Sequence, residues 1–520
     1  MSNTGTANTE AAFTPHLWGA TLLYALLVVN PTVWAESFPQ SDFLTGRTTF
    51  ITLAANDPWQ DFKRIKQGQS PKRTEQGKDR DTGNPKSTFK KPVNRRNGAK
   101  VGPNPALIRA STDTSVGNAS WLYFAGTMNI KSNAYYDPHD INFTWAYARR
   151  EPLPNYPRIV VSMHGADVRE DALEAFEPST RGDIEIRTLD AGAYNNTWLE
   201  WWMFGRDGTP YPGRRIAAAL QFLSTRYWID MSVNGIVLEG EGMGGTGAVI
   251  QTMLLPSPWR EYIAYSSARS GTGMPRKMAQ HENTRFAKFP ADNGTNSALW
   301  DSIDFEVQSA NDPVVRGLHY RHAFSTDDPS GIEPGNANIQ LQFINLIEQH
   351  KIAGAFAWVQ SGASFFEQGV NLPDMSKFET TEQDVTLDRV HPAITDSTGN
   401  YPLLAVDRSN QTQFPRGHYN MGITWDHANT LDGREQIVLP LKYQRRINIG
   451  KNIPDQPEAI TVSVTPRRAH SFRLQDGNLL KWSFNDSELT GTARVVGDTL
   501  TIEAIPLVSG EAYKSLRIYR

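Results

Sequence analysis

An apolar run leads directly into a cluster of glycines near the middle of the chain. Residues 235–238 read GIVL, residues 240–245 read GEGMGG, and residues 248–255 continue with helical spacing. The pattern predicts a buried strand, a tight turn in which glycine permits close backbone approach, and a helix that packs back on the strand. Strand–turn–helix units of this kind build parallel sheets, so the segment predicts an α/β fold.

The flanking segments repeat the same alternation. Apolar runs and turn residues predict strands at 121–125, 142–148, 158–163, 262–266, 319–325 and 354–359, and a strand followed by a loop over 184–196. Helical spacing predicts helices at 212–228 and 336–350. The expected architecture is therefore a mostly parallel sheet flanked by helices, within a domain covering residues 106–365.

Composition excludes several classes of function. The chain has 520 residues, which is too long for one ordinary domain. Hydrophobic residues make up 39% of it. A net charge of -3 indicates no nucleic-acid partner, and the lack of cysteine excludes disulfides, cysteine nucleophiles and thiolate metal sites. The chain contains no recognisable metal-ligand pattern, Walker loop or dinucleotide fingerprint, so we expect no cofactor and no metal.

The N-terminus has the features of an export signal. Residues 17–29 form an apolar run that is short for a membrane span, and Val33-Trp34-Ala35 is a cleavage site with small outer residues. No Lys or Arg precedes the run, since Arg47 is the first. We expect a signal peptide over 1–35, cleaved near Ala35, and a secreted or periplasmic protein that contacts the membrane only transiently. An uncleaved anchor is the alternative.

Two further regions flank the predicted α/β domain. Within the N-terminal segment 36–105, residues 61–100 are rich in Lys, Arg, Gly, Pro and Asn, which predicts a solvated, disordered insertion. A basic arm for acidic polysaccharide or lipid headgroups is the alternative. Residues 366–520 contain strand-like runs at 385–395, 437–443 and 460–466, with hairpin-type turns at Asp476-Gly477 and Gly497-Asp498. They predict a β-sandwich-like accessory region.

Three motifs in this order resemble the α/β-hydrolase core of secreted esterases and prolyl-oligopeptidase-like enzymes, over about residues 157–364. His164-Gly165-Ala166 resembles the loop that donates one oxyanion-hole N–H. Residues 240–248 resemble the nucleophile elbow, with Gly242 where the family has serine. Residues 265–271 resemble the stretch after the next strand.

The resemblance assigns the remaining catalytic positions. The acid is expected after the strand that ends near Ser325, at Asp328 with Asp327 as the neighbouring choice, and the base position is occupied by Ala363 instead of histidine. The oxyanion hole would use the N–H groups of Ala166 and Met243. His164 and the aromatic residues Trp198, Trp201 and Trp202 are candidates for substrate binding.

Other polar residues are expected to have structural roles. His319, His322, His391 and His418 are interpreted as hydrogen-bonded structural histidines. Ser266, Ser267 and Ser270 follow a strand without the Gly-x-Ser-x-Gly turn, so they are interpreted as loop hydroxyls. Glu241 precedes the nucleophile position, and its side chain is expected to point away from it.

Three hypotheses follow. The first is a catalytically impaired α/β-hydrolase-fold protein that binds an extracellular ligand, such as a carbohydrate or acyl polymer, in the former active-site cleft. The second is an active carboxylic-ester or peptide hydrolase with a non-standard nucleophile or base. The third is that Gly242 and Ala363 were introduced to trap a substrate. The residues alone are compatible with all three.

Overall fold

A computed structural model describes 106–113, 119–130, 141–165, 182–189, 211–269, 271, 274, 301–325, 335–359, 385–400, 417–445, 455–485 and 488–520. The chain divides into two compact units, Met1–Thr49 and Phe50–Arg520, and every described residue belongs to the second. The predicted signal peptide, the N-terminal segment 36–105 and its basic stretch lie outside the described residues. They remain predictions.

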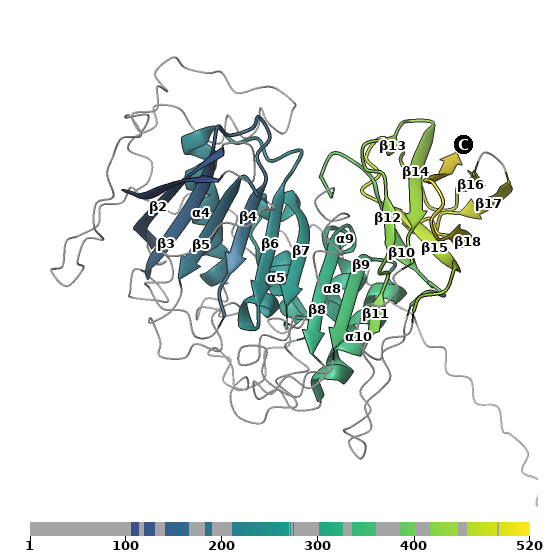
Figure 1. The fold of residues 1–520 in the computed structure, drawn as a ribbon, viewed down its shortest axis with the longest axis horizontal. Coiled ribbons are helices and arrows are strands. Elements are labelled where there is room, and N and C mark those ends of the chain that lie inside the picture. The colour runs from purple at the N-terminus through teal and green to yellow at the C-terminus, as the bar shows by residue number, and fades with distance from the viewer. Residues whose placement is uncertain are drawn as a thin grey trace, which may run out of the picture. The chain divides into compact units, whose positions relative to one another are not determined.

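A ten-stranded sheet forms the centre of the second unit (Figure 1). In sheet order its strands are β1 (Ala106–Asp113), β2 (Ala119–Ile130), β3 (Ile141–Glu151), β5 (Ile184–Leu189), β4 (Ile159–Met163), β6 (Ile236–Glu241), β7 (Ile263–Arg269), β8 (His319–Ser325), β9 (Ala353–Val359) and β11 (Gly417–Tyr419). The adjacent strands from β5 to β9 pair in parallel, whereas β1–β2, β2–β3, β3–β5 and β9–β11 pair antiparallel. The predicted mostly parallel core is confirmed, with antiparallel strands at both edges.

Helices connect the parallel strands. They are α4 (Tyr211–Tyr227), α5 (Met243–Leu254), the 3-10 helix η5 (Trp259–Tyr262), α8 (Phe305–Asn311), α9 (Pro313–Arg316) and α10 (Gly335–Gln349). The predicted helices at 212–228, 248–255 and 336–350 correspond to α4, α5 and α10, which begin one to five residues earlier. The helix α5 starts before the apolar spacing does, because its first turn consists of the glycine cluster.

The two faces of the sheet pack against different partners. One face packs against the helices α4, α5, α8 and α10. The strand residues in this core include Ile159, Val161, Ile236 and Leu238. Val160 and Val237 point the other way and share a second core with the C-terminal strands. Because consecutive residues of β4 are buried on opposite faces, the run reads as continuously apolar. This confirms the prediction for 158–163.

The C-terminal part forms two antiparallel sheets. One contains β10 (His391–Thr395), β15 (Ala459–Arg467) and β18 (Ile502–Val508). The other contains β12 (Ile423–Trp425), β14 (Gln436–Tyr443), β19 (Lys514–Tyr519), β16 (Leu479–Phe484) and β17 (Leu489–Arg494), with β13 (Leu431–Asp432) paired to β14. Apolar side chains of both sheets meet in the second core.

The C-terminal part differs from the sequence expectations at three places and agrees with them at the Gly497-Asp498 turn. The strand expected from residue 385 begins at His391, because residues 385–390 form bends. The turn at Asp476-Gly477 is not a hairpin, since β15 and β16 before and after it belong to different sheets. Gly497-Asp498 is a minimal hairpin turn, closed by paired backbone bonds between Val496 and Thr499. The strand β11, from the predicted accessory region, extends the main sheet instead.

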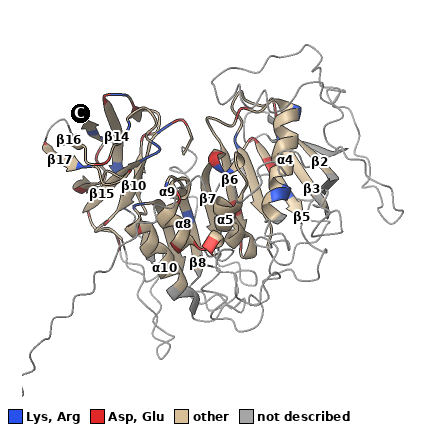
Figure 2. Cartoon of the chain, turned by 180° about the vertical axis from the view of Figure 1, so that it is seen from behind, with Lys and Arg blue, Asp and Glu red and all other residues tan. Residues whose placement is uncertain are grey.

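The described residues contain neither a membrane-spanning helix nor a metal cluster. No helix among them has the length and apolarity to cross a membrane. In the same residues, no group of three or more His, Cys, Asp or Glu side chains is arranged to hold a metal ion. Lys, Arg, Asp and Glu are scattered over both the main sheet and the C-terminal strands (Figure 2).

Candidate active site

The strand order creates a candidate site at the carboxyl ends of the central parallel strands. The neighbours β4 and β6 are parallel, but the chain leaves β4 toward β5 and leaves β6 toward β7, on opposite sides. In open α/β sheets, ligands bind outside the carboxyl ends of strands at such a switch point. Here those ends carry His164-Gly165 after β4 and Gly242 after β6.

Gly242 joins β6 to α5 in a conformation that side chains rarely adopt. Its φ is 57° and its ψ is -118°. The Gly242 N–H donates to the Arg269 carbonyl at 2.8 Å, and the Gly242 carbonyl accepts from Thr246 N–H at 3.1 Å. A residue with positive φ on a sharp strand-to-helix turn has the backbone geometry of a nucleophile elbow. The structure therefore supports the turn that the glycine cluster predicts.

The glycines around position 242 are required by close backbone contacts. A Cβ atom on Gly240 would lie 2.3 Å from the Gly244 carbonyl carbon, and one on Gly244 would lie 2.1 Å from the Met163 carbonyl oxygen. A Cβ on Gly245 would lie 2.5 Å from the Arg269 carbonyl oxygen. Such approaches are far inside van der Waals contact. The first turn of α5 thus fits between the ends of β4 and β7 only because positions 244 and 245 have no side chains.

Position 242 differs from its neighbours because it is open. A Cβ atom there would have no atom within 4 Å. Packing therefore excludes side chains at 240, 244 and 245 but leaves room for one at 242. Only the positive φ opposes a side chain at this position, at a cost of about 1–3 kcal/mol.

The loop after β4 approaches the elbow from the other side. A Cβ on Gly165 would lie 3.6 Å from the Glu241 carbonyl oxygen. The neighbouring His164 is half-buried, and its Nδ1 lies 2.7 Å from the Gly165 carbonyl oxygen. The predicted partnership between this loop and the elbow is therefore consistent with the described part of the loop. Ala166, the expected N–H donor, lies outside the described residues.

Backbone donors at the start of α5 face the same edge. The first four N–H groups of a helix have no partner within the helix, and the helix dipole adds positive potential there. Met243 is the first residue of α5, and Gly242 at the N-cap contributes no side-chain bond. The Met243 N–H is thus available in the position predicted for an oxyanion-hole donor.

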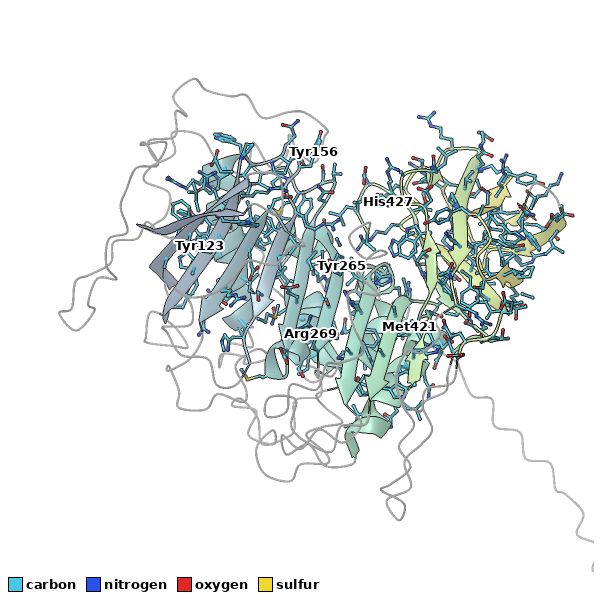
Figure 3. All side chains as sticks on the ribbon, viewed as in Figure 1. Tyr123, Tyr156, Tyr265, Arg269, Met421 and His427 are labelled. Carbon is cyan, nitrogen blue, oxygen red and sulfur yellow. The ribbon has the colours of Figure 1, made fainter. Side chains whose placement is uncertain are left out.

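Two charged residues flank the elbow. Glu241 and Arg269 end β6 and β7 at paired positions of the sheet, and Arg269 is exposed beside α5 (Figure 3). Within the described residues the two side chains form no ion pair with each other. The sequence did not indicate Arg269 as a site residue, because its position beside the elbow depends on the register between β6 and β7.

Several predicted site residues cannot be located. Asp327, Asp328, Ala363, Trp198, Trp201, Trp202 and Ser270 lie outside the described residues. Their roles stay predictions. The structure brings together His164, Gly242 and Met243 of the predicted site, all at the carboxyl edge of the parallel strands.

The alternative nucleophiles and bases are buried elsewhere in the sheet. Ser266 and Ser267 are buried within β7, so their predicted position in a loop after the strand is wrong. The Ser266 hydroxyl donates to the Ala248 carbonyl at 3.0 Å inside the core, which is a structural role. His322 lies among the rings of Phe324, Phe343 and Phe356 on the helix-covered face, and burial lowers its pKa to about 3. His418 is also buried, which lowers its pKa to about 4.

The expectation of hydrogen-bonded structural histidines is only half right. His319, His322, His391 and His418 are all buried. His418 Nδ1 lies 3.5 Å from the Gln456 amide nitrogen. In contrast, both ring nitrogens of His391 and the Nδ1 of His319 have no hydrogen-bond partner among the described residues. The sequence identifies these histidines as structural but does not reveal their unpaired nitrogens.

Known proteins resemble this chain in structure but not in sequence. No protein-family model matches the sequence, and a comparison with curated proteins finds no match. An acylaminoacyl peptidase of Pyrococcus horikoshii is structurally similar, with a TM-score of 0.36 and 11% identity, over 51% of this chain and 46% of the peptidase. This chain therefore matches about half of that enzyme's length.

Two smaller esterases show similar overlap. Brefeldin A esterase, a bacterial homologue of human hormone sensitive lipase, has a TM-score of 0.28 and 17% identity, over 46% of this chain and 69% of the esterase. An S-formylglutathione hydrolase from Staphylococcus aureus has a TM-score of 0.31 and 12% identity, over 46% of this chain and 89% of the hydrolase.

Proposed function

We propose that this chain is an exported α/β-hydrolase-fold protein that has lost covalent catalysis and binds an extracellular ligand at its elbow. The ligand class we favour is a carbohydrate or acyl polymer with an ester or carboxylate group. The proposed site comprises His164, Gly242 and Met243 at the switch point between β4 and β6. The accessory β-rich region, which we propose to be a sandwich, would support binding rather than chemistry.

The conformation of Gly242 carries the proposal. Its φ of 57° and ψ of -118° form a sharp turn between β6 and α5, and close contacts exclude side chains at the neighbouring glycines but not at position 242. An open position on a sharp strand-to-helix turn, at the switch point of the sheet, is where an elbow presents its nucleophile. The turn is best explained as an elbow that has been kept after the nucleophile was lost.

The loss of the nucleophile changes what the site can do. Removing the serine of a catalytic triad lowers turnover by about 10⁶, and removing a second member costs little more. An oxyanion hole and binding alone still provide about 10³–10⁴ over the reaction in water. With Gly242 in place of serine, and with Ala363 in the proposed base position, the remaining capacity is recognition of a carbonyl or carboxylate oxygen by N–H groups.

A fluorophosphonate probe separates this proposal from an active hydrolase. The probe labels an activated serine stoichiometrically and leaves structural hydroxyls unmodified. We expect no labelled serine by mass spectrometry of the intact protein. Stoichiometric labelling of a single serine would overturn the proposal and establish the alternative, an esterase or peptidase with a non-standard nucleophile.

Restoring the missing residues tests whether the elbow still has its geometry. Gly242→Ser combined with Ala363→His should give measurable hydrolysis of p-nitrophenyl acetate, because the nucleophile would stand beside the Met243 N–H. Gly497→Ser is a matched control, since Gly497 has a φ of 62° and a Cβ added there would also have no atom within 4 Å. No gain over this control would refute the assignment of position 242 or of position 363.

Blocking the elbow tests ligand binding. A glycan and ester library screened against the full chain would identify the ligand, and Gly242→Phe would place a ring in the open space at position 242. We expect this variant to lose binding at least tenfold, whereas Gly497→Phe should bind normally. Equal binding by both variants would show that the ligand site lies elsewhere on the protein.

A further inference from the structure

Two histidines from separate parts of the chain meet at the amino ends of the parallel strands, away from the elbow at the carboxyl ends. His319 is the first residue of β8, and His391 is the first residue of β10 in a C-terminal sheet. Their ring centroids are 6.4 Å apart, and the His319 ring lies 6.0 Å from the ring of Trp425 in β12. The three rings therefore join the main sheet to both C-terminal sheets.

Neither histidine is adapted to carry a charge. His319 is 4% exposed and His391 is 1% exposed. Both nitrogens of His391 and the Nδ1 of His319 have no hydrogen-bond partner. An imidazolium at either position would have buried N–H groups without acceptors, which is costly in a low-dielectric environment.

The groups that act on these rings are arginines and other histidines. Arg321 of β8 and Arg468, which follows β15, act on His319. Arg468, Arg467, His319 and His427 act on His391. Burial is the main cause of the lowered pKa of both rings, which for His319 falls to about 3, and the neighbouring cations lower it further. No carboxylate among these groups would stabilise a protonated ring.

Arginines attach the same C-terminal segment to the main sheet. Arg468 is partly buried, and its guanidinium donates to the carbonyls of Ile263 and Ala264 at 2.6 and 2.9 Å. Arg467 donates to the carbonyls of His350 and Lys351 just before β9. These bonds contribute attraction but place two fixed positive charges beside the histidines.

We propose that protonation of His319 and His391 releases β10 and β12 from the main sheet, so that this contact opens in acid. The contact is stable while both rings are neutral and is flanked by Arg467 and Arg468. A proton on either ring adds a buried cation near Arg467 and Arg468, and solvation of both rings in the open state removes that cost. The proposal does not depend on the ligand proposed for the elbow.

The expected pH range follows from the direction of the pKa changes. An exposed histidine has a pKa near 6.5, and both rings have lower values in the closed contact. Opening is therefore coupled to proton uptake below about pH 6.5, while the closed form stays unprotonated. The equilibrium constant for opening should rise by up to about tenfold per pH unit for each histidine, or about one hundredfold for the pair.

Native-state hydrogen exchange with mass spectrometry measures this coupling in the full chain. After correction for intrinsic exchange, the logarithm of the opening constant for peptides containing β10 and β12 should approach a slope of -2 against pH between 6 and 5. In His391→Gln and in His319→Gln the slope should fall to about -1. Peptides containing β4 and β6 should stay protected over the same range.

The slope is the readout because it does not depend on how much a substitution weakens packing. His391→Phe provides a second non-titrating variant should glutamine perturb the contact, and it should also have a slope near -1. His470→Gln is the matched control, since His470 is exposed in the same C-terminal part, and it should leave the slope unchanged. A wild-type slope near zero, unchanged slopes in the His319 and His391 variants, or simultaneous opening of β4 and β6 would each overturn the proposal.

Discussion

The elbow lies at the carboxyl ends of the parallel strands, and the histidine contact lies at their amino ends. The two regions are built in opposite ways. At the elbow, backbone meets backbone, because Gly240, Gly244 and Gly245 have no room for a Cβ. At the histidine contact, large rings and arginine side chains fill the space between segments. The elbow is fixed by steric exclusion, whereas the histidine contact depends on the protonation and hydrogen bonding of side chains.

This difference predicts how each region responds to change. A region held by steric exclusion should tolerate changes of pH but not an added methyl group. A region held by buried polar side chains should tolerate changes of shape but not a new charge or a lost hydrogen bond. Substitutions in the two regions should therefore differ in the size and kind of their effects.

Gly244→Ala should have the largest effect. Its Cβ would lie 2.1 Å from the Met163 carbonyl oxygen, so α5 or β4 would have to move. We expect a loss of about 3 kcal/mol or more in the free energy of unfolding, measured by urea denaturation. Gly242→Ala, two residues earlier, should cost only about 1–2 kcal/mol, since its Cβ has open space and only φ is unfavourable. Equal losses would mean that the elbow is not held by close packing.

Arg468→Met should have the next largest effect on the free energy of unfolding. It would remove the donors to the Ile263 and Ala264 carbonyls and leave those carbonyls without these bonds in the interior. We expect a loss of about 2–3 kcal/mol in the free energy of unfolding. Arg494→Met is the control, because Arg494 is exposed and donates to the Gly477 carbonyl at the surface, and it should cost under about 0.5 kcal/mol. A neutral Arg468→Met would show that the guanidinium does not stabilise the contact.

His322 lies in the helix-covered core, outside both the elbow and the histidine contact, and provides a separate test of pH sensitivity. Burial lowers its pKa to about 3 in the folded state, so below about pH 6.5 only the unfolded chain takes up this proton. Stability is therefore complete above pH 6.5 and is lost as the pH falls toward 3. Between pH 6 and 5, the wild type should lose about 1 kcal/mol more than His322→Leu in urea denaturation. Parallel losses would indicate that His322 is protonated in the folded protein.

Ser266→Ala should have the smallest effect. It removes the hydroxyl that donates to the Ala248 carbonyl, a bond that links β7 to α5. We expect a loss of about 1 kcal/mol in the free energy of unfolding and no change in fluorophosphonate labelling. A change in labelling would identify Ser266 as reactive and contradict its structural role.

The central strands and helices were predictable because their patterns are local. The apolar run 158–163 and the helical spacing of 336–350 each extend over a whole element. Neighbouring residues therefore suffice to predict which positions are buried. The start of β10 was missed because 385–390 is apolar enough for a strand but forms bends. Pairing of β11 with β9 was not predictable, since three residues contain too little pattern to specify a partner.

The glycine cluster alone determined that a strand, a tight turn and a helix follow one another at 235–255 and that position 242 has no nucleophile. This is local information, because glycine spacing and apolar periodicity act within a few residues. Only the tertiary structure decided which glycines are forced by contact and which one has open space. It also decided that His319 and His391, far apart in sequence, share one buried contact among cations. Contacts between distant segments depend on strand order and register, which no single stretch of sequence contains.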